Sequence, residues 1–130
     1  MSTPISSLMQ GEVLAAHIDD CMALVQQLLH RAQHSWVPVK DDAGTVVGAI
    51  SATDVLHFQA QERDAQTVKA WQWCHYRPLT VAPDTSVAEV ARLMLEQRVH
   101  HAVVVDQGRL QGVVSTLDLL SLIAGPAAGN

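Results

Sequence analysis

The pattern of hydrophobic and polar residues along this chain occurs twice, once in each half. In each half a short apolar stretch, Val13 to Ala16 or Leu79 to Ala82, precedes a run with apolar residues at helical spacing. A second compact apolar run then follows, Trp36 to Val39 or Ala102 to Val105, and it is typical of a buried strand. The pattern therefore predicts a strand, a helix and another strand in each half.

Capping and turn residues separate these elements. Asp19 and Asp20 begin the first helical run, and Ser86 begins the second with Glu89 at the spacing of a capping box. Each buried strand ends in a turn, at Gly44 in the first half and at Gln107-Gly108 in the second, so a hairpin is predicted in both.

A second helix then opens in each half. Ser51 and Ser115 begin these helices, which we expect to end near Ala65 and Ala124. The predicted order is β-α-β-β-α, twice, with residues 125–130 as a frayed tail.

The two halves also share residue identities. When the first half is aligned with the second at a shift of 65 positions, which becomes 64 after the turn at Gly44, twelve residues are identical. These pair Leu14, Asp19, Ala23, Val25, Leu28, Val39, Asp41, Gly44, Gly48, Ser51, Asp54 and Leu56 with Leu79, Asp84, Ala88, Val90, Leu93, Val104, Asp106, Gly108, Gly112, Ser115, Asp118 and Leu120. Such a match indicates an internal repeat.

Composition narrows the class of protein. A chain of 130 residues needs only one globular unit, and with three Trp, one Tyr and one Phe its core must be aliphatic. We expect Val39, Ile50, Val104 and Val114 to form the strand core. A net charge of −5 argues against nucleic acid as a partner, and no apolar run is long enough to cross a membrane.

The chemistry-bearing residues argue against catalysis and metal binding. Two cysteines are too few for a disulfide framework and favour a reducing, cytoplasmic location. Seven histidines occur without metal-ligand spacing, and no nucleophile-base pattern or phosphate loop is present, so neither an enzyme nor a metal site is expected.

The segments Gly48 to Asp54 and Gly112 to Asp118, with Val37-Pro38-Val39 before the first turn, resemble the cystathionine beta-synthase (CBS) domain. The tandem resembles a Bateman module across nearly the whole chain. The second copy, Val99 to Asp106, is similar to a strand of the AMP-activated protein kinase gamma subunit, in which a basic pair approaches nucleotide phosphates. Val103 departs from the pattern, since most members have Pro there.

The resemblance implies an α/β (α+β) fold in which two β-α-β-β-α repeats pack about a pseudo-twofold axis. We place the first repeat at residues 9–65, a linker at 66–73 and the second repeat at 74–125. It also implies a homodimer formed through the second helices, whose apolar residues are Val55, Leu56, Phe58, Leu119, Leu120, Leu122 and Ile123.

The resemblance further implies two nucleotide sites, each shared between repeats, with Asp on the ribose and Ser near phosphate. The favoured site, in which histidines face the phosphate, takes Ala49, Ile50, Ser51, Thr53, Asp54, Leu79, Thr80, His100, His101 and Ala102. The second site takes Leu14, Ala15, Ser35, Trp36, Val113, Ser115, Thr116 and Asp118. AMP or ADP is the expected ligand, no cofactor is required, and an unidentified regulated protein is the expected partner.

Three alternatives remain open from the residues alone. Each Ser-x-x-Asp is also an ordinary helix cap, and one of the two adjacent histidines can be structural. Trp36 can stack on a base or pack in the core or an interface. The whole module can be a ligand-free dimerisation scaffold, or a sensor of another adenosyl compound such as S-adenosylmethionine.

Overall fold

A computed structural model describes residues 3–32 and 34–124, with side-chain burial described up to residue 122. The chain divides into two compact units: residues 14–78 form one, and the residues from 79 onward form the other together with the segment before residue 14. The predicted tail, residues 125–130, lies outside the described residues, as does the side chain of Ile123.

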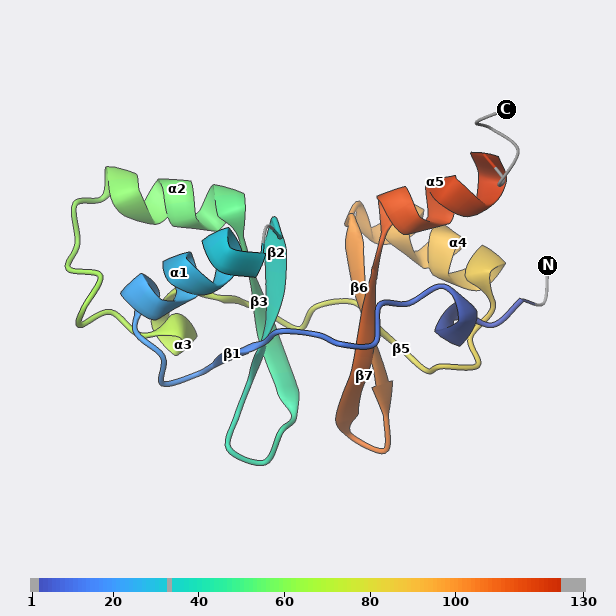
Figure 1. Ribbon diagram of the computed structural model, residues 1–130, viewed down its shortest axis with the longest axis horizontal. Coiled ribbons are helices and arrows are strands. Elements are labelled where there is room, and N and C mark those ends of the chain that lie inside the picture. The colour runs from blue at the N-terminus through green and yellow to red at the C-terminus, as the bar shows by residue number, and fades with distance from the viewer. Residues whose placement is uncertain (1–2, 33, 125–130) are drawn as a thin grey trace. The chain divides into compact units, whose positions relative to one another are not determined.

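The unit of residues 14–78 contains the first repeat and two further elements. Its elements are β1 (Ala16–His17), α1 (Met22–Ala32), β2 (Trp36–Lys40), β3 (Val46–Ser51), α2 (Ala52–Ala60), α3 (Ala70–Trp73) and β4 (His75–Tyr76). They form a four-stranded sheet in the order β1-β2-β3-β4, in which β1 and β2 are parallel and the other pairs antiparallel. Figure 1 shows α1 and α2 on the same side of β2 and β3.

The other unit repeats this arrangement. Its elements are η1 (Ile5–Ser7), β5 (Thr80–Val81), α4 (Val87–Gln97), β6 (His101–Asp106), β7 (Arg109–Ser115) and α5 (Thr116–Ala124). The sheet has the order β5-β6-β7, and an isolated bridge joins Gln10 of the N-terminal segment to Val113 of β7. The order β-α-β-β-α is thus confirmed in both repeats.

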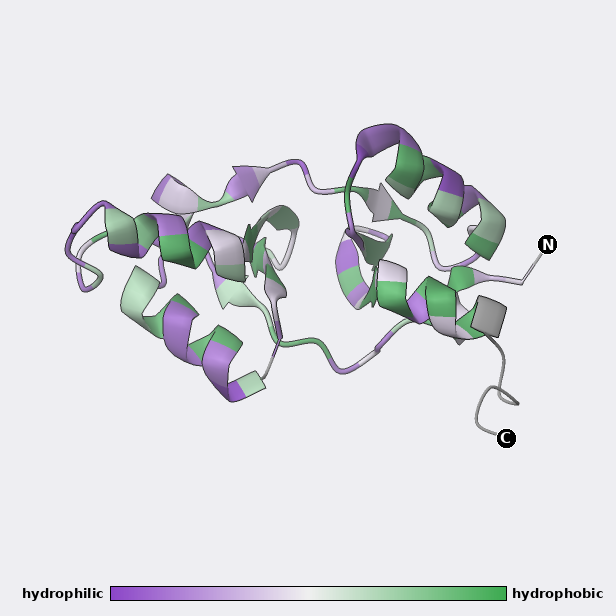
Figure 2. Ribbon diagram, turned by 90° about the horizontal axis from the view of Figure 1, so that it is seen from above, coloured by the Kyte–Doolittle hydropathy of each residue, from purple (hydrophilic) through white to green (hydrophobic). Residues whose placement is uncertain are grey.

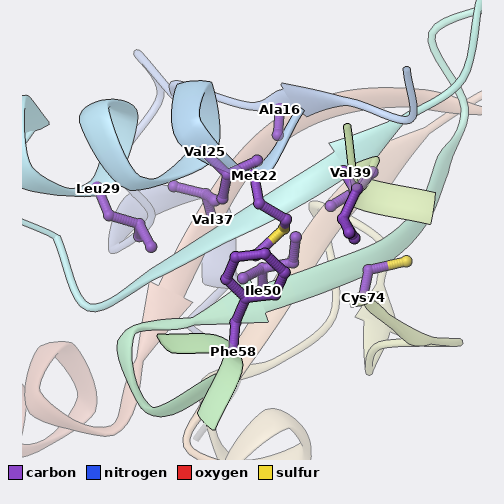
Figure 3. Close-up of a cluster of buried hydrophobic side chains, with 11 residues drawn as sticks. Ala16, Met22, Val25, Leu29, Val37, Val39, Ile50, Phe58 and Cys74 are labelled. Atoms are coloured by element: carbon purple, nitrogen blue, oxygen red, sulfur yellow. The ribbon is translucent and has the colours of Figure 1, made fainter. Parts of the chain in front are cut away.

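Each unit has its own aliphatic core. In the first, α1, α2 and alternate residues of β2 and β3 form one buried cluster, and Figure 3 shows Met22, Ile50 and Phe58 gathered within it. Val39, Ile50, Val104 and Val114 are all fully buried, as predicted. Each such side chain stabilises the folded chain by about 1.5–3 kcal/mol relative to its exposed state.

The hairpin turns fall where the glycines predict them. Gly44 and Gly108 have φ values of +84° and +77°, a backbone conformation that side chains with a Cβ rarely adopt. Both hairpins, β2–β3 and β6–β7, are therefore confirmed at the predicted turns.

The end of α2 differs from the prediction. The helix ends at Ala60, not near Ala65. The N–H groups of Gln61 and Glu62 donate to the carbonyls of Phe58 and Gln59, which closes a tight turn, and Glu62 has a φ of +56°. The chain then returns along α1, where the carbonyl of Ala65 accepts from the N–H of Ala23. The predicted linker, residues 66–73, consequently packs on the first repeat, with Val68 and Ala70 buried.

Two smaller predictions are also corrected. Ser86 accepts a hydrogen bond from the Glu89 N–H, but the Glu89 carboxylate pairs with Arg92, so only half of the predicted capping box forms. The homodimer prediction includes Phe58 and Leu119 among the apolar residues of the second helices, but these two are buried in the cores because they lie on the helix faces that meet the sheets.

Candidate functional site

The two Ser-x-x-Asp segments lie where a strand becomes a helix, at the start of α2 and of α5. The Ser51 hydroxyl accepts from the Asp54 N–H at 3.1 Å, and the Asp54 Oδ2 accepts from the Ser51 N–H at 2.8 Å. Ser115 and Asp118 make the same two bonds at 3.3 and 2.8 Å. Each pair is a reciprocal cap that fixes a carboxylate beside a helix N-terminus, where N–H groups and the helix dipole favour an anion.

The Asp54 carboxylate has an additional partner from the segment that follows α2. His75 Nε2 lies 2.7 Å from Asp54 Oδ1, and the Trp73 Nε1–H donates to the Asp54 carbonyl at 2.9 Å. Since an ionised carboxylate only accepts, the imidazole donates this bond. Asp54 is consequently buried, with a hydrogen bond on each carboxylate oxygen.

No pattern in the sequence predicts this contact. Cys74 and His75 have no further metal ligands near them in the sequence, and the separation of 21 positions between Asp54 and His75 hides their proximity. Only the pairing of β4 with β3, in which His75 lies opposite Ala49, brings them together.

Asp118 has different surroundings from Asp54. Its Oδ2 accepts from both the N–H and the hydroxyl of Ser115, the latter at 3.2 Å. This carboxylate is partly buried, whereas that of Asp54 is buried.

The remaining residues of the predicted favoured site come from both units. Ala49 and Ile50 lie in β3, Thr53 lies in the first turn of α2, Leu79 precedes β5, Thr80 lies in β5, His100 precedes β6, and His101 and Ala102 lie in β6. The buried side chains are those of Ala49, Ile50, Leu79 and Ala102, whereas Thr53, Thr80 and His100 are exposed. Leu79, Ala102 and Ile50 thus belong to the cores, and only their backbone atoms are suited to contact a ligand.

The residues of the predicted second site also occur in both units. Leu14 and Ala15 precede β1, Ser35 precedes β2, Trp36 begins β2, Val113 and Ser115 lie in β7, and Thr116 and Asp118 lie in the first turn of α5. Trp36 is half-buried, lies opposite Ser51 in the β2–β3 pair, and is not part of the core cluster. The assignment of residues from two repeats to one site stays a prediction.

His101 is a titratable group beside the second cap. It lies opposite Ser115 in the β6–β7 pair, and the neighbouring His100 carbonyl accepts from the Thr116 N–H at 2.9 Å. Burial lowers the pKa of His101 and the charge of His100 lowers it further, while Asp118 opposes both effects. Burial thus favours the neutral imidazole, and a further anion beside His101 would favour its protonated form.

One group in the described residues has the ligand types and spacing of a metal site. His17 Nε2 lies 2.6 Å from Asp42 Oδ1, and Asp19 completes the group. However, His17 Nδ1 accepts from the Asp19 N–H at 3.0 Å, so both ring nitrogens already have hydrogen-bond partners. These exposed side chains form a hydrogen-bonded turn.

The helices of the described residues are too short or too polar to cross a membrane.

This chain is similar to known proteins in both sequence and structure. A family model described as the CBS domain matches residues 5–61 and 72–125. Arabinose 5-phosphate isomerase KpsF of Escherichia coli is 27% identical over 117 residues, which are 89% of this chain and 36% of that protein. The gamma-3 subunit of 5′-AMP-activated protein kinase of Homo sapiens is 33% identical over 102 residues, 72% of this chain and 21% of the subunit. The chain therefore spans about a third of the length of the isomerase and about a fifth of the length of the kinase subunit.

Solved structures of similar fold carry adenosyl ligands. The CBS domain of a bacterial CNNM/CorC family Mg²⁺ transporter in complex with ATP has a TM-score of 0.85 and 25% identity, covering 95% of this chain and 88% of that one. CBSX2 in complex with AMP has a TM-score of 0.78 and 24% identity, covering 91% of this chain and 93% of its own. A CBS domain pair in complex with 5′-methylthioadenosine and S-adenosylmethionine has a TM-score of 0.83 and 22% identity, and the match covers 93% of this chain and 99% of that one. At these identities the last two show likeness of fold.

Proposed function

The chain belongs to the CBS domain family, and on this premise we propose that it is a regulatory module, not an enzyme, that binds an adenine nucleotide. AMP or ADP is the proposed ligand, and occupancy is passed to a partner protein. The observation that carries the proposal is the pair of Ser/Asp caps, which holds a carboxylate at the start of α2 and of α5.

The chemistry of each cap suits a nucleoside phosphate. A carboxylate accepts hydrogen bonds from vicinal ribose hydroxyls, and the first N–H groups of a helix attract phosphate. The family resemblance assigns the phosphate of the first-repeat site to His100 and His101. The ATP and AMP complexes of proteins with this fold support an adenine nucleotide over other anions.

Calorimetry with AMP and adenosine tests the proposal. Asp54→Asn and Asp118→Asn keep an oxygen that can accept the backbone bond of each cap but remove the charge, and each is expected to weaken its site by about 1.5–3 kcal/mol. Asp106→Asn, at the hairpin end of β6, is the matched control and should bind as the wild type does. Binding of neither ligand, or equal affinities for the wild type and both cap variants, would contradict the proposal.

The phosphate contact has a separate test. Phosphate favours the protonated imidazole, so AMP should bind more tightly as the pH falls from 8 toward 6, while adenosine should not. Because burial lowers the pKa of His101, the neutral imidazole is favoured before AMP binds, and the phosphate supplies the charge that favours its protonation. An equal pH dependence for AMP and adenosine would remove the histidines from the mechanism.

A ligand-free scaffold is the second candidate function. It is favoured by the caps themselves, since each Ser/Asp pair satisfies its own backbone and Asp54 also bonds to His75. A thermal-shift screen with AMP, ADP, ATP, S-adenosylmethionine and NAD separates the candidates. A ligand at 100 times its dissociation constant stabilises the folded state by about 2.7 kcal/mol, whereas a scaffold shows no shift with any of them.

We also propose that the chain forms a homodimer through its helices. Leu95, Leu117 and Leu120 of the second repeat are 80%, 73% and 55% exposed, and α4 and α5 border an apolar hollow of about 490 Å³. Figure 2 shows hydrophobic bands along α5, the helix that precedes the C-terminus label. Light scattering should give twice the chain mass of 14.1 kDa, and Leu120→Glu should reduce it to the monomer value. A wild-type monomer at micromolar concentration would contradict this proposal.

A further inference from the structure

His75 occupies the carboxylate oxygen that a ribose would need at the first repeat. We propose that His75 is a blocking residue of the first-repeat nucleotide site: its imidazole holds Asp54 in the free protein and must release it before the ribose hydroxyls bind. This inference rests on the proposed nucleotide function. It concerns which of the two sites is accessible, and it assigns to His75 a role in selecting ligands by their ribose.

The position of His75 is fixed from two sides. On one side, β4 pairs with β3, so that Ala49 lies opposite His75 and Gly48 opposite Tyr76. On the other, Trp73 donates to the Asp54 carbonyl and packs edge to face on Phe58, with ring centroids 5.2 Å apart. The backbone of His75 is therefore held beside the first turn of α2, and its side chain reaches the Asp54 carboxylate from there.

Hydrogen-bond capacity explains why His75 blocks the site. The Oδ2 of Asp54 accepts the Ser51 N–H at 2.8 Å, which leaves Oδ1 as the oxygen open to a ligand. His75 donates to that oxygen at 2.7 Å. A carboxylate oxygen has two lone pairs, so both hydroxyls of a vicinal diol can donate to this one oxygen only if His75 gives up its own hydrogen bond to it. The His75 side chain is 76% exposed, so it has room to rotate away when a ligand displaces it.

The second repeat has a different residue at the position of His75. The internal repeat places Gln10 there, since Gln10 bridges to Val113 as His75 pairs with Ala49. The Asp118 carboxylate accepts from the N–H and the hydroxyl of Ser115 through its Oδ2. The two caps are therefore alike in their own geometry, and at the first one His75 adds a hydrogen bond to the other carboxylate oxygen.

Calorimetry of His75→Ala tests the role of His75. In an Asp118→Asn background, which leaves the first-repeat site, His75→Ala should bind adenosine roughly two- to fivefold more tightly, the range for an exposed charged hydrogen bond. The affinity for 2′,3′-dideoxyadenosine, which lacks both ribose hydroxyls, should not change. His75→Gln, which retains a donor, should bind adenosine as the background protein does, and Gln10→Ala is the matched control in the second repeat.

The outcomes separate the two hypotheses. Adenosine binding that is unchanged or weaker in His75→Ala overturns the blocking role while leaving the nucleotide function in place. An equal gain for adenosine and dideoxyadenosine also overturns it, because the ribose hydroxyls would not be involved. Absence of adenosine binding in the wild type and in every variant overturns the proposed function, and the role of His75 with it. A circular dichroism spectrum and melting curve like those of the background protein establish that His75→Ala is folded.

Discussion

Gly48 is the residue that allows β4 to lie against β3, and its substitution by Ala is the most informative single change in this chain. A Cβ at this position would lie 2.7 Å from the His75 carbonyl oxygen and 2.8 Å from the Cys74 Sγ. Real Cβ contacts essentially never occur below 3.0 Å, and one of the two neighbours is backbone. The substitution must therefore move the strand that positions His75 and buries Cys74.

The magnitude follows from two opposing effects. Overpacking of this kind costs about 1–3 kcal/mol. Against it, replacing Gly by Ala reduces the entropy of the unfolded chain and stabilises by about 0.4–1 kcal/mol. We expect a net loss of about 1–2 kcal/mol in the free energy of unfolding, which is roughly 4–8 °C in Tm for a chain of this size.

Urea denaturation of Gly48→Ala and Gly11→Ala checks this reasoning. Gly11 is the matched control because a Cβ there would meet nothing within 4 Å, so its substitution should leave stability unchanged or slightly raised. Gly112→Ala should behave like Gly48→Ala, since its Cβ would lie 2.7 Å from the Gln10 carbonyl oxygen. If Gly48→Ala is no less stable than Gly11→Ala, the segment around β4 yields without cost and the reasoning is wrong.

Three further predictions concern protonation, reactivity and the dependence of the repeats on each other. Burial lowers the pKa of His101 below its ordinary 6.5, so the unfolded chain binds more protons than the folded chain in acid. The free energy of unfolding should therefore fall as the pH drops below about 6.5. Urea melts at pH 5.5 and 7.5 should show this fall for the wild type and not for His101→Gln. Burial raises the pKa of the Cys74 thiol, so iodoacetamide should label it more slowly than the partly exposed Cys21 when the two peptides are followed by mass spectrometry. In a fragment of residues 14–78, alternate residues of β2 and β3 point away from the fragment's own helices, so the fragment should be unfolded or self-associated in ultracentrifugation. A stable monomeric fragment would show that the repeats fold independently.

The sequence by itself determined the repeated elements and the local geometry of the caps. Helical spacing, the turn at Gly44 and the twelve identities between the halves are local signals, and each element follows from residues within a few positions of one another. The reciprocal cap of Ser51 and Asp54 belongs to the same class, since its atoms are three residues apart. For this reason the order β-α-β-β-α and the strand core were predictable without coordinates.

Only the tertiary structure decided how the segments outside the repeats are used. The N-terminal segment adds Ile5 to the core of the second repeat, while residues 66–78 fold back on the first repeat and bring His75 to Asp54. These contacts join residues separated by 21 positions or more, and the polar, irregular composition of the two segments carries no period from which a partner could be inferred. The physical reason is that local propensity determines each helix and strand, whereas the accessibility of Asp54 depends on which distant segment of the chain packs against the edge of its sheet.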